Sequence, residues 1–181
     1  LCFVPLAGCG AEEDNPSGSL TGTAGPEETP EPEEPQEPAA GDRVLAENRQ
    51  VNYGIVYAEE CSATIKESVT YLYDAIKKRS DGGVTTVEAV EYGAENDPDA
   101  LQILIGDVGT SESNAVMEAI GYGDWTVRFS GNKLVVAAYS EYALDSAITE
   151  LIQQIKQHAD DAGRIAFPST LNVTKTFVET A

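Results

Sequence analysis

Hydrophobic residues recur at helical spacing in three stretches of the chain. Ile65, Val69, Leu72 and Ile76 are separated by four, three and four residues, which places them on one face of a helix. A longer helix is predicted after Ser140, a good N-cap residue, with a buried stripe of Ala143, Ala147, Ile148, Leu151, Ile152 and Ile155. Between these two, Thr110 or Ser111 is predicted to cap a short helix that carries Ala115, Val116, Ala119 and Ile120.

Other stretches have the pattern of β-strands. Single strands are predicted at residues 51–58, 84–92, 100–107 and 164–168. The stretch 84–92 alternates as a half-exposed strand does, whereas 100–107 is almost wholly apolar, which is typical of a central strand covered on both faces. The segment DWTVRFSGNKLVVAAYS predicts a hairpin that turns at Gly131-Asn132, with Trp125, Val127 and Phe129 on one face.

The predicted order is therefore strand, helix, strand, strand, helix, strand, strand, helix, strand. Connections of this kind build an α+β fold with α/β character, in which helices pack on a mixed β-sheet. We expect one domain over residues 43–181, which is long enough to enclose a single hydrophobic core.

The start of the chain differs in composition from the rest. An apolar run, LCFVPLAG, is followed at once by Cys9 and then by acidic residues and proline. Leu6-Ala7-Gly8-Cys9 resembles the lipobox of bacterial lipoproteins, in which the cysteine thiol receives a diacylglycerol after the signal peptide is cut off. The resemblance implies that residues 1–9 are the end of a signal peptide and that Cys9 is the lipidation site. The alternative is an ordinary signal peptide in which Cys9 is incidental.

Residues 10–42 have the composition of a linker. They hold six of the nine prolines of the chain and almost no large apolar side chains. Such a sequence buries too little surface to offset the entropy of ordering, so we expect a disordered linker. Fully extended, it reaches about 100 Å, a length suited to crossing a cell wall. The alternative is that its acidic run binds calcium or a basic partner.

The charge of the chain excludes some partners. The sequence has 11 Lys and Arg against 31 Asp and Glu, a net charge of −20, and ten of the acids lie in residues 1–42, which contain no base. This charge repels nucleic acid and anionic lipid surfaces, so membrane attachment has to be covalent or hydrophobic. We expect a lipid anchor in the membrane, at the extracytoplasmic face, and a Gram-positive surface fits the linker best.

Two candidate catalytic motifs are weak. His158 is the only histidine, which excludes His-rich metal sites, and its place near the end of a helix favours a solvated surface role. Ser130 and Lys133 match the S-x-x-K motif of penicillin-binding enzymes, but a hairpin turn separates them where those enzymes have a helix. We therefore expect neither to be catalytic.

Three further loops carry residues that could form a site. Cys61 lies at a helix start, where the pKa of a thiol is lowered, yet an idle or buried thiol is the preferred interpretation. Asp97 and Asp99 lie in one tight loop, for which an Asx-turn is favoured over a calcium site. The loop IGDVGTSES before the short helix could accept an anion, although Asp107 opposes phosphate. We expect no metal and no cofactor.

The aromatic residues around the hairpin are the remaining candidates. Tyr122, Trp125 and Tyr139 lie close to one another in the predicted fold, and sugar rings stack on exposed aromatic side chains. They are the candidate sugar-stacking residues, although core packing is the common fate of a hairpin tryptophan.

The globular part also resembles a known accessory module. YGIVY followed by an amphipathic helix, then ILIGD…SES, then GNKLVVAAYSEYALDSAITELI is similar to the N-terminal α/β domain that precedes the catalytic barrel of family 20 β-hexosaminidases and α-glucuronidases. The resemblance extends over roughly residues 44–170. In that family the module has no catalytic residues of its own and packs beside a catalytic domain.

These observations lead to one expected function and one alternative. We expect a membrane-tethered extracellular lipoprotein whose folded part is a non-catalytic accessory module of a carbohydrate-active, glycoside hydrolase-like protein. The alternative is a stand-alone surface lipoprotein that binds a glycan or a protein partner.

Overall fold

The three helical patterns of the sequence form three helices. The computed structural model describes residues 41–177, so the lipobox, Cys9 and the linker up to residue 40 lie outside the described residues. The helices are α1 (Ala63–Arg79), α2 (Ser111–Ala119) and α3 (Glu141–His158). Their N-caps are Ser62, Thr110 and Ser140, each of which accepts a backbone N–H from the residue three positions later. Capping in this way satisfies one of the backbone donors left free at the start of a helix.

Six strands form the main sheet, in the spatial order β4-β3-β5-β7-β6-β9. Their bounds are β3 (Gly54–Ala58), β4 (Val87–Val90), β5 (Gln102–Ile105), β6 (Asp124–Ser130), β7 (Lys133–Ala138) and β9 (Asn172–Thr176). Strands β4, β3, β5 and β7 are parallel to one another, whereas β6 is antiparallel to both of its neighbours. The sheet is therefore mixed, and the predicted fold class is confirmed.

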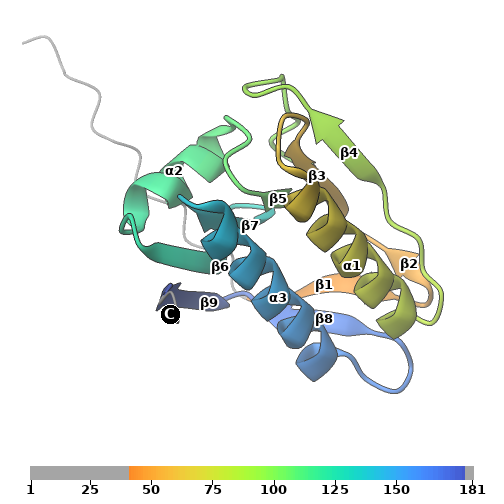
Figure 1. Cartoon of the computed structure of the whole chain (residues 1–181). Helices are drawn as coiled ribbons and strands as arrows, with labels where there is room; N and C mark the ends of the chain where they lie inside the picture. Colours follow the sequence, from red (N-terminus) through yellow and green to blue (C-terminus); the bar gives the residue numbers. More distant parts are fainter. Residues whose placement is uncertain (1–40, 178–181) are drawn as a thin grey trace, which may run out of the picture. The chain divides into compact units, whose positions relative to one another are not determined.

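Helices cover the two faces of this sheet unequally. On one face α1 and α3 lie side by side (Figure 1), and their buried stripes pack against Ile55, Ile103 and Val127 of the strands. On the other face α2 packs through Val116 and Met117 onto a smaller hydrophobic cluster. Since β5 contributes side chains to both clusters, it is the central strand that its continuous apolar run predicts.

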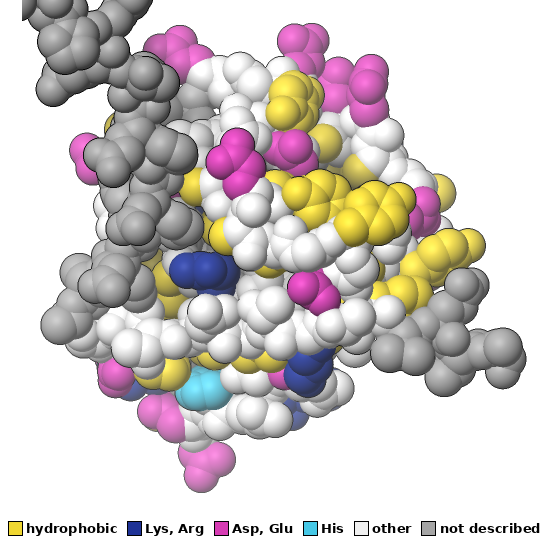
Figure 2. Space-filling model, turned by 90° about the vertical axis from the view of Figure 1, so that its left-hand side faces the viewer, with side chains coloured by type: hydrophobic (Ala, Val, Ile, Leu, Met, Phe, Trp, Pro, Cys, Tyr) yellow, Lys and Arg dark blue, Asp and Glu magenta, His cyan; other side chains and the backbone are white. Residues whose placement is uncertain are grey.

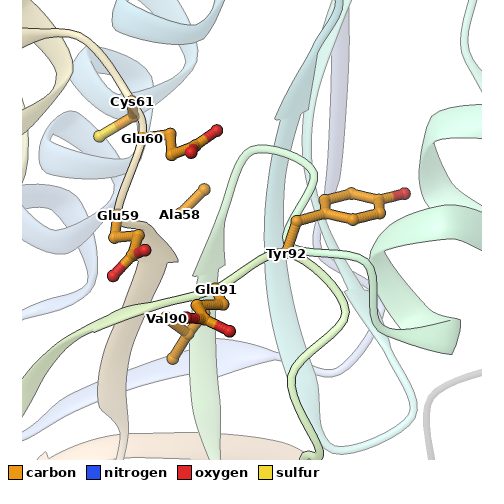
Figure 3. A pocket seen from close by; sticks show the side chains of 7 residues that line it. All are labelled: Ala58, Glu59, Glu60, Cys61, Val90, Glu91 and Tyr92. Carbon is orange, nitrogen blue, oxygen red and sulfur yellow. The ribbon is translucent and has the colours of Figure 1, made fainter.

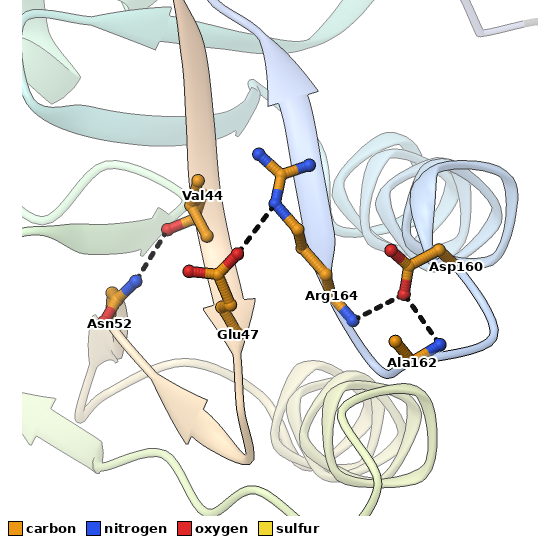
Figure 4. Close-up of polar contacts among 6 residues, drawn as sticks. All are labelled: Val44, Glu47, Asn52, Asp160, Ala162 and Arg164. Carbon is orange, nitrogen blue, oxygen red and sulfur yellow. Dashed lines mark hydrogen bonds and ion pairs between the residues drawn. The ribbon is translucent and has the colours of Figure 1, made fainter.

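A second, three-stranded sheet closes one end of the larger core. It consists of β1 (Asp42–Glu47), β2 (Gln50–Val51) and β8 (Ile165–Pro168), in the antiparallel order β2-β1-β8. Figure 4 shows two hydrogen bonds that stabilise this sheet. Arg164 Nε donates to Glu47 Oε1 at 3.1 Å, and Asn52 Nδ2 donates to the Val44 carbonyl at 3.0 Å. Asp160 Oδ1 accepts from the backbone N–H groups of Ala162 and Arg164 and so shapes the turn before β8.

The element order from the sequence is incomplete in three places. The predicted strand 51–58 is two strands, because residue 51 pairs with β1 whereas β3 pairs within the main sheet. Strand β8 was expected to join the main sheet but pairs with β1 instead. The order also lacked β1 and β9, which each have at most two fully buried residues.

The predicted strand 84–92 is shorter than expected and forms a sheet edge. Only Val87–Val90 is strand, and it pairs on one side alone, with β3. Three of its four residues are exposed.

Among the described residues, no helix is long and apolar enough to cross a membrane.

Candidate functional site

Exposed tyrosines gather at one edge of the main sheet. Five tyrosines have an exposed fraction above two fifths: Tyr71 57%, Tyr92 66%, Tyr122 86%, Tyr139 45% and Tyr142 71%. Tyr71 lies on α1, whereas the other four lie where the parallel strands end or where β6 begins. We call this region the carboxyl edge, and define it by the segments 59–62, 91–95, 106–110, 120–123 and 139–142.

The topology of the sheet explains why these segments meet. Strands β3, β5 and β7 are parallel neighbours, and each is followed directly by a helix, so α1, α2 and α3 all begin at the edge where these strands end. After β3 the chain crosses to α1 on one face of the sheet, and after β5 it crosses to α2 on the other face. The boundary between β3 and β5 is therefore a topological switch point, and in open α/β sheets ligands bind in the crevice at such a point.

Tyr122 and Tyr139 form a stacked pair. Their ring centroids are 5.7 Å apart and their planes differ by 25°. The Tyr139 hydroxyl donates a 2.7 Å hydrogen bond to the Met117 carbonyl in the last turn of α2, which fixes that ring. Tyr122 rests on it and is 86% exposed, so the outer face of the Tyr122 ring is open to solvent. An open face on a supported ring is suited to stacking against the apolar side of a sugar.

Trp125, the third predicted stacking residue, lies elsewhere. Its side chain is 6% exposed and belongs to the core that α1 and α3 cover, whereas Tyr139 reaches α2 on the opposite face of the sheet. Lys175 Nζ lies 5.3 Å from the centre of the tryptophan ring and also contacts Glu150 at 2.8 Å. The structure therefore brings together Tyr122 and Tyr139 but not Trp125.

Tyr92 lies on the same edge, beside the loop before α2. Its hydroxyl is 3.5 Å from Asp107 Oδ2. Gly93 donates its N–H to the Val108 carbonyl at 3.0 Å, and a Cβ on Gly109 would lie 2.5 Å from the Gly93 nitrogen. Gly109 also has a φ of +78°, so glycine is required there twice over, for space and for conformation.

A hollow of about 560 Å³ opens beside Tyr92 at the ends of β3 and β4. Figure 3 shows the carboxylates of Glu59, Glu60 and Glu91 around it, while the Tyr92 ring points away from the other side chains drawn.

Cys61 also lines the hollow. Burial raises the pKa of this thiol, more than Lys66 lowers it, so Cys61 is a poor nucleophile and the idle-thiol interpretation is favoured.

The carboxyl edge is acidic and contains no base. Its five segments carry Glu59, Glu60, Glu91, Glu95, Asp107 and Glu141, and they contain no lysine, arginine or histidine. Figure 2, seen from the left-hand side of Figure 1, shows hydrophobic and acidic side chains on the upper part of that face, with Lys and Arg only lower down. Such a surface repels anionic ligands and leaves carboxylate oxygens to accept hydrogen bonds from hydroxyl groups.

The loop before α2, considered from the sequence as a possible anion site, bonds several of its own N–H groups. Asp107 Oδ1 accepts the Gly109 N–H at 2.9 Å, and Ser113 Oγ accepts the Thr110 N–H at 3.1 Å. Thr110 Oγ1 in turn accepts the Ser113 N–H, which completes a capping box. The N–H groups of Gly109, Thr110 and Ser113 are therefore occupied by the loop's own side chains.

Lys133 of the S-x-x-K motif has a structural role. Its side chain is fully buried, and its ammonium group donates to the carbonyls of Asp97 (2.6 Å) and Ala100 (2.7 Å) and to Gln102 Oε1 (2.9 Å). An ammonium group has three donors, so all are used. Burial lowers the pKa of Lys133, against the opposing effect of Glu112, Asp97 and Asp99. Lys133 thus anchors the crossover segment 91–101, which joins β4 to β5 without a helix.

Two other candidates also have local partners. Asp97 Oδ1 accepts the Asp99 N–H at 2.9 Å, so the predicted Asx-turn is confirmed. The predicted solvated role of His158 is wrong: the side chain is half-buried, its Nδ1 lies 2.9 Å from the Gln154 carbonyl, and its ring packs edge-on against the buried Phe167. Within residues 41–177, no three His, Cys, Asp or Glu side chains are arranged to hold a metal ion.

Comparison with known proteins yields likeness of fold only. No family model matches the sequence, and no curated protein matches it. One similar solved structure is a family GH115 4-O-methyl-α-glucuronidase with specificity for decorated arabinogalactans, at 13% identity and a TM-score of 0.46. Another is CpGH84D, at 17% identity and a TM-score of 0.46. The chain resembles a part of each.

That part is small. The matches cover 74% and 78% of this chain, but only 18% and 23% of the two solved chains. The lipobox lies outside the described residues and stays a prediction.

Sequence reasoning missed two members of the tyrosine group, Tyr92 and Tyr142. Tyr92 is the last residue of the predicted strand 84–92, and Tyr142 lies just after the predicted cap Ser140. Each therefore had a signal in the sequence, because a residue at the end of a parallel strand or at the start of the following helix lies at the carboxyl edge.

Proposed function

We propose that this chain is a lipid-tethered extracytoplasmic module of a carbohydrate-active protein, and that its carboxyl edge binds a glycan. The stacked pair of Tyr122 and Tyr139 carries the proposal, because it presents an open, supported aromatic face on the surface. The segments of the carboxyl edge carry six carboxylates and no lysine, arginine or histidine, which favours a ligand rich in hydroxyl groups and poor in negative charge.

In this proposal the module does not supply the catalytic residues. Its strongest chemical candidates are committed to the fold: Lys133 holds a loop, Cys61 has a raised pKa, and His158 contacts a helix carbonyl. Catalysis belongs to another domain of the same protein, as the resemblance to accessory modules of glycoside hydrolases implies.

Exposed apolar side chains support the proposal that a neighbouring domain packs against this module. Val84 is 65% exposed and Leu101 is 36% exposed, and both line a hollow of about 400 Å³ beside the start of β3. This hollow lies at the opposite end of β3 from the carboxyl edge, so a neighbour seated there leaves the tyrosines free. Large exposed apolar side chains that lie together mark interaction surfaces.

Binding to polysaccharides tests the glycan role. The 181-residue chain is run by affinity electrophoresis through gels that contain xylan, mannan, galactan or hydroxyethyl cellulose. We expect retardation in at least one gel, and Tyr122→Ala to weaken that binding about tenfold, the loss of about 1.4 kcal/mol of stacking energy. Tyr122→Phe keeps the ring and should bind nearly as the parent does.

Tyr71→Ala is the matched control, since it removes an exposed tyrosine from α1, away from the carboxyl edge. Equal losses for Tyr71→Ala and Tyr122→Ala, or retardation in none of the gels, would contradict the proposal.

A stand-alone surface lipoprotein is the second candidate, and the hollow of about 560 Å³ at the carboxyl edge favours it. The mass of the native protein extracted from membranes separates the two candidates. A species much larger than 19.2 kDa supports the accessory module, and a lipidated species near that mass supports the stand-alone protein.

A further inference from the structure

Tyr92 and the tyrosine pair lie at opposite ends of α2. The Tyr92 ring packs beside Gly109, with its Cε1 atom 3.2 Å from the position a Cβ would take there, just before the N-cap of α2. At the other end, Tyr139 donates its hydroxyl hydrogen to the carbonyl of Met117, in the last turn of the same helix. Helix α2 therefore separates two exposed aromatic positions.

The length of α2 sets their spacing. The helix has nine residues, which at 1.5 Å per residue gives about 13 Å. That distance exceeds the width of a single sugar ring. Two aromatic positions at the two ends of such a helix suit a chain of several sugar units.

Tyr92 is held in place from two directions. The Gly93 N–H donates to the Val108 carbonyl at 3.0 Å, and farther along the same crossover segment Lys133 anchors the carbonyls of Asp97 and Ala100. These contacts fix the backbone that carries Tyr92, which lowers the entropy lost when a ligand stacks on its ring. Its exposed fraction of 66% leaves surface for that contact.

We propose that Tyr92 forms a second aromatic subsite, so that the site takes an extended, uncharged glycan chain of several units lying along α2. This inference rests on the proposed glycan-binding function and deepens it. Tyr122 and Tyr139 hold one part of the chain and Tyr92 holds another. Asp107 and the exposed Glu118 lie near the two ends of α2, and their negative charge disfavours uronic-acid or sulfated units.

Two linked subsites predict a dependence on chain length. The second contact adds affinity only when one ligand spans both positions, and then it acts as an intramolecular event. Short oligosaccharides should therefore be insensitive to Tyr92, while long ones should depend on both tyrosine positions.

The test is calorimetric titration of the 181-residue chain with cello-, xylo-, manno- and galacto-oligosaccharides of one to six units. We expect Tyr92→Ala to leave the affinity for mono- and disaccharides unchanged and to weaken binding of the longest oligomers about tenfold. Tyr122→Ala should weaken binding at every length. Tyr92→Phe keeps the ring and should bind as the parent does, and Tyr71→Ala is the control for loss of an unrelated exposed tyrosine.

Each failure has its own signature. If long oligomers bind through Tyr122 but Tyr92→Ala leaves their affinity unchanged, the extended site is refuted and the proposed function stands. If affinity does not rise with chain length, the extended site is refuted in the same way. Binding of no oligosaccharide by the parent chain refutes both proposals.

Discussion

Replacing Lys133 by methionine tests the most unusual feature of the interior. The side chain is fully buried and donates three hydrogen bonds of 2.6–2.9 Å, all to the segment that precedes or begins β5. Methionine keeps most of the apolar stem and removes the ammonium group. The substitution therefore removes the hydrogen bonds that anchor the crossover segment and leaves the packing of β7 almost unchanged.

The expected loss follows from what the substitution leaves behind. Two carbonyls and one side-chain amide oxygen lose a charged donor, and each unsatisfied acceptor costs about 1–3 kcal/mol when water cannot reach it. The residues that carry them are partly exposed, so water replaces some of these bonds. Methionine also relieves the cost of burying a charge. We therefore expect Lys133→Met to lower the free energy of unfolding by about 2–4 kcal/mol.

Urea unfolding followed by tryptophan fluorescence is the assay, because Trp125 is the only tryptophan of the chain and is buried in the core. Lys156→Met, an exposed position on α3, is the matched control and should change stability by less than about 0.5 kcal/mol. A loss below about 1 kcal/mol for Lys133→Met would refute the anchoring role. A loss equal to that of the control would refute it as well.

Three further predictions concern charge and modification. The hydrogen bond from Lys175 lowers the pKa of Glu150 below its usual value, so the stabilisation is present at neutral pH and is lost as the pH falls through the folded-state pKa. Glu150→Gln should lower the free energy of unfolding by about 0.5–1 kcal/mol at pH 7. Urea midpoints of the variant and the parent chain should converge below about pH 4, and a difference that stays constant with pH would contradict this. Because the pKa of Cys61 is raised, peptide mass spectrometry should find its alkylation by iodoacetamide slower than that of glutathione at pH 8, and equal rates would count against it. Cys9→Ala should abolish incorporation of labelled fatty acid in a bacterial host, and persistent labelling would remove the proposed tether.

The sequence predicts best the elements with long periodic patterns. Helices α1 and α3 and the β6–β7 hairpin were all predicted, α3 with its cap Ser140 and the hairpin with its turn, because each buries a continuous stripe that its own spacing reveals. The β1–β2 hairpin was missed because its turn places Asn48 and Arg49 at positive φ, and arginine gives no signal for that conformation. The β1–β8 pairing joins residues more than one hundred positions apart, which local patterns do not encode.

Strand alternation by itself predicts the burial of Trp125 and Lys133. Trp125 shares a face with Val127 and Phe129, so the same alternation that predicts the hairpin predicts a buried tryptophan. Likewise Lys133 is on the face of Val135, which indicates an inward lysine that needs acceptors. The position of Tyr92 against the loop before α2 depends on the crossover segment, so only the structure reveals it.

The central claim is that tyrosines of the carboxyl edge contact a glycan. The most direct measurement is an NMR titration of the 181-residue chain, labelled at its tyrosine rings, with the longest oligosaccharide that it binds. The account predicts shifts of the ring signals of Tyr122, Tyr139 and Tyr92 and an unchanged signal from Tyr71. Shifts confined to Tyr71, or binding that leaves the Tyr122 and Tyr139 signals unmoved, would contradict it.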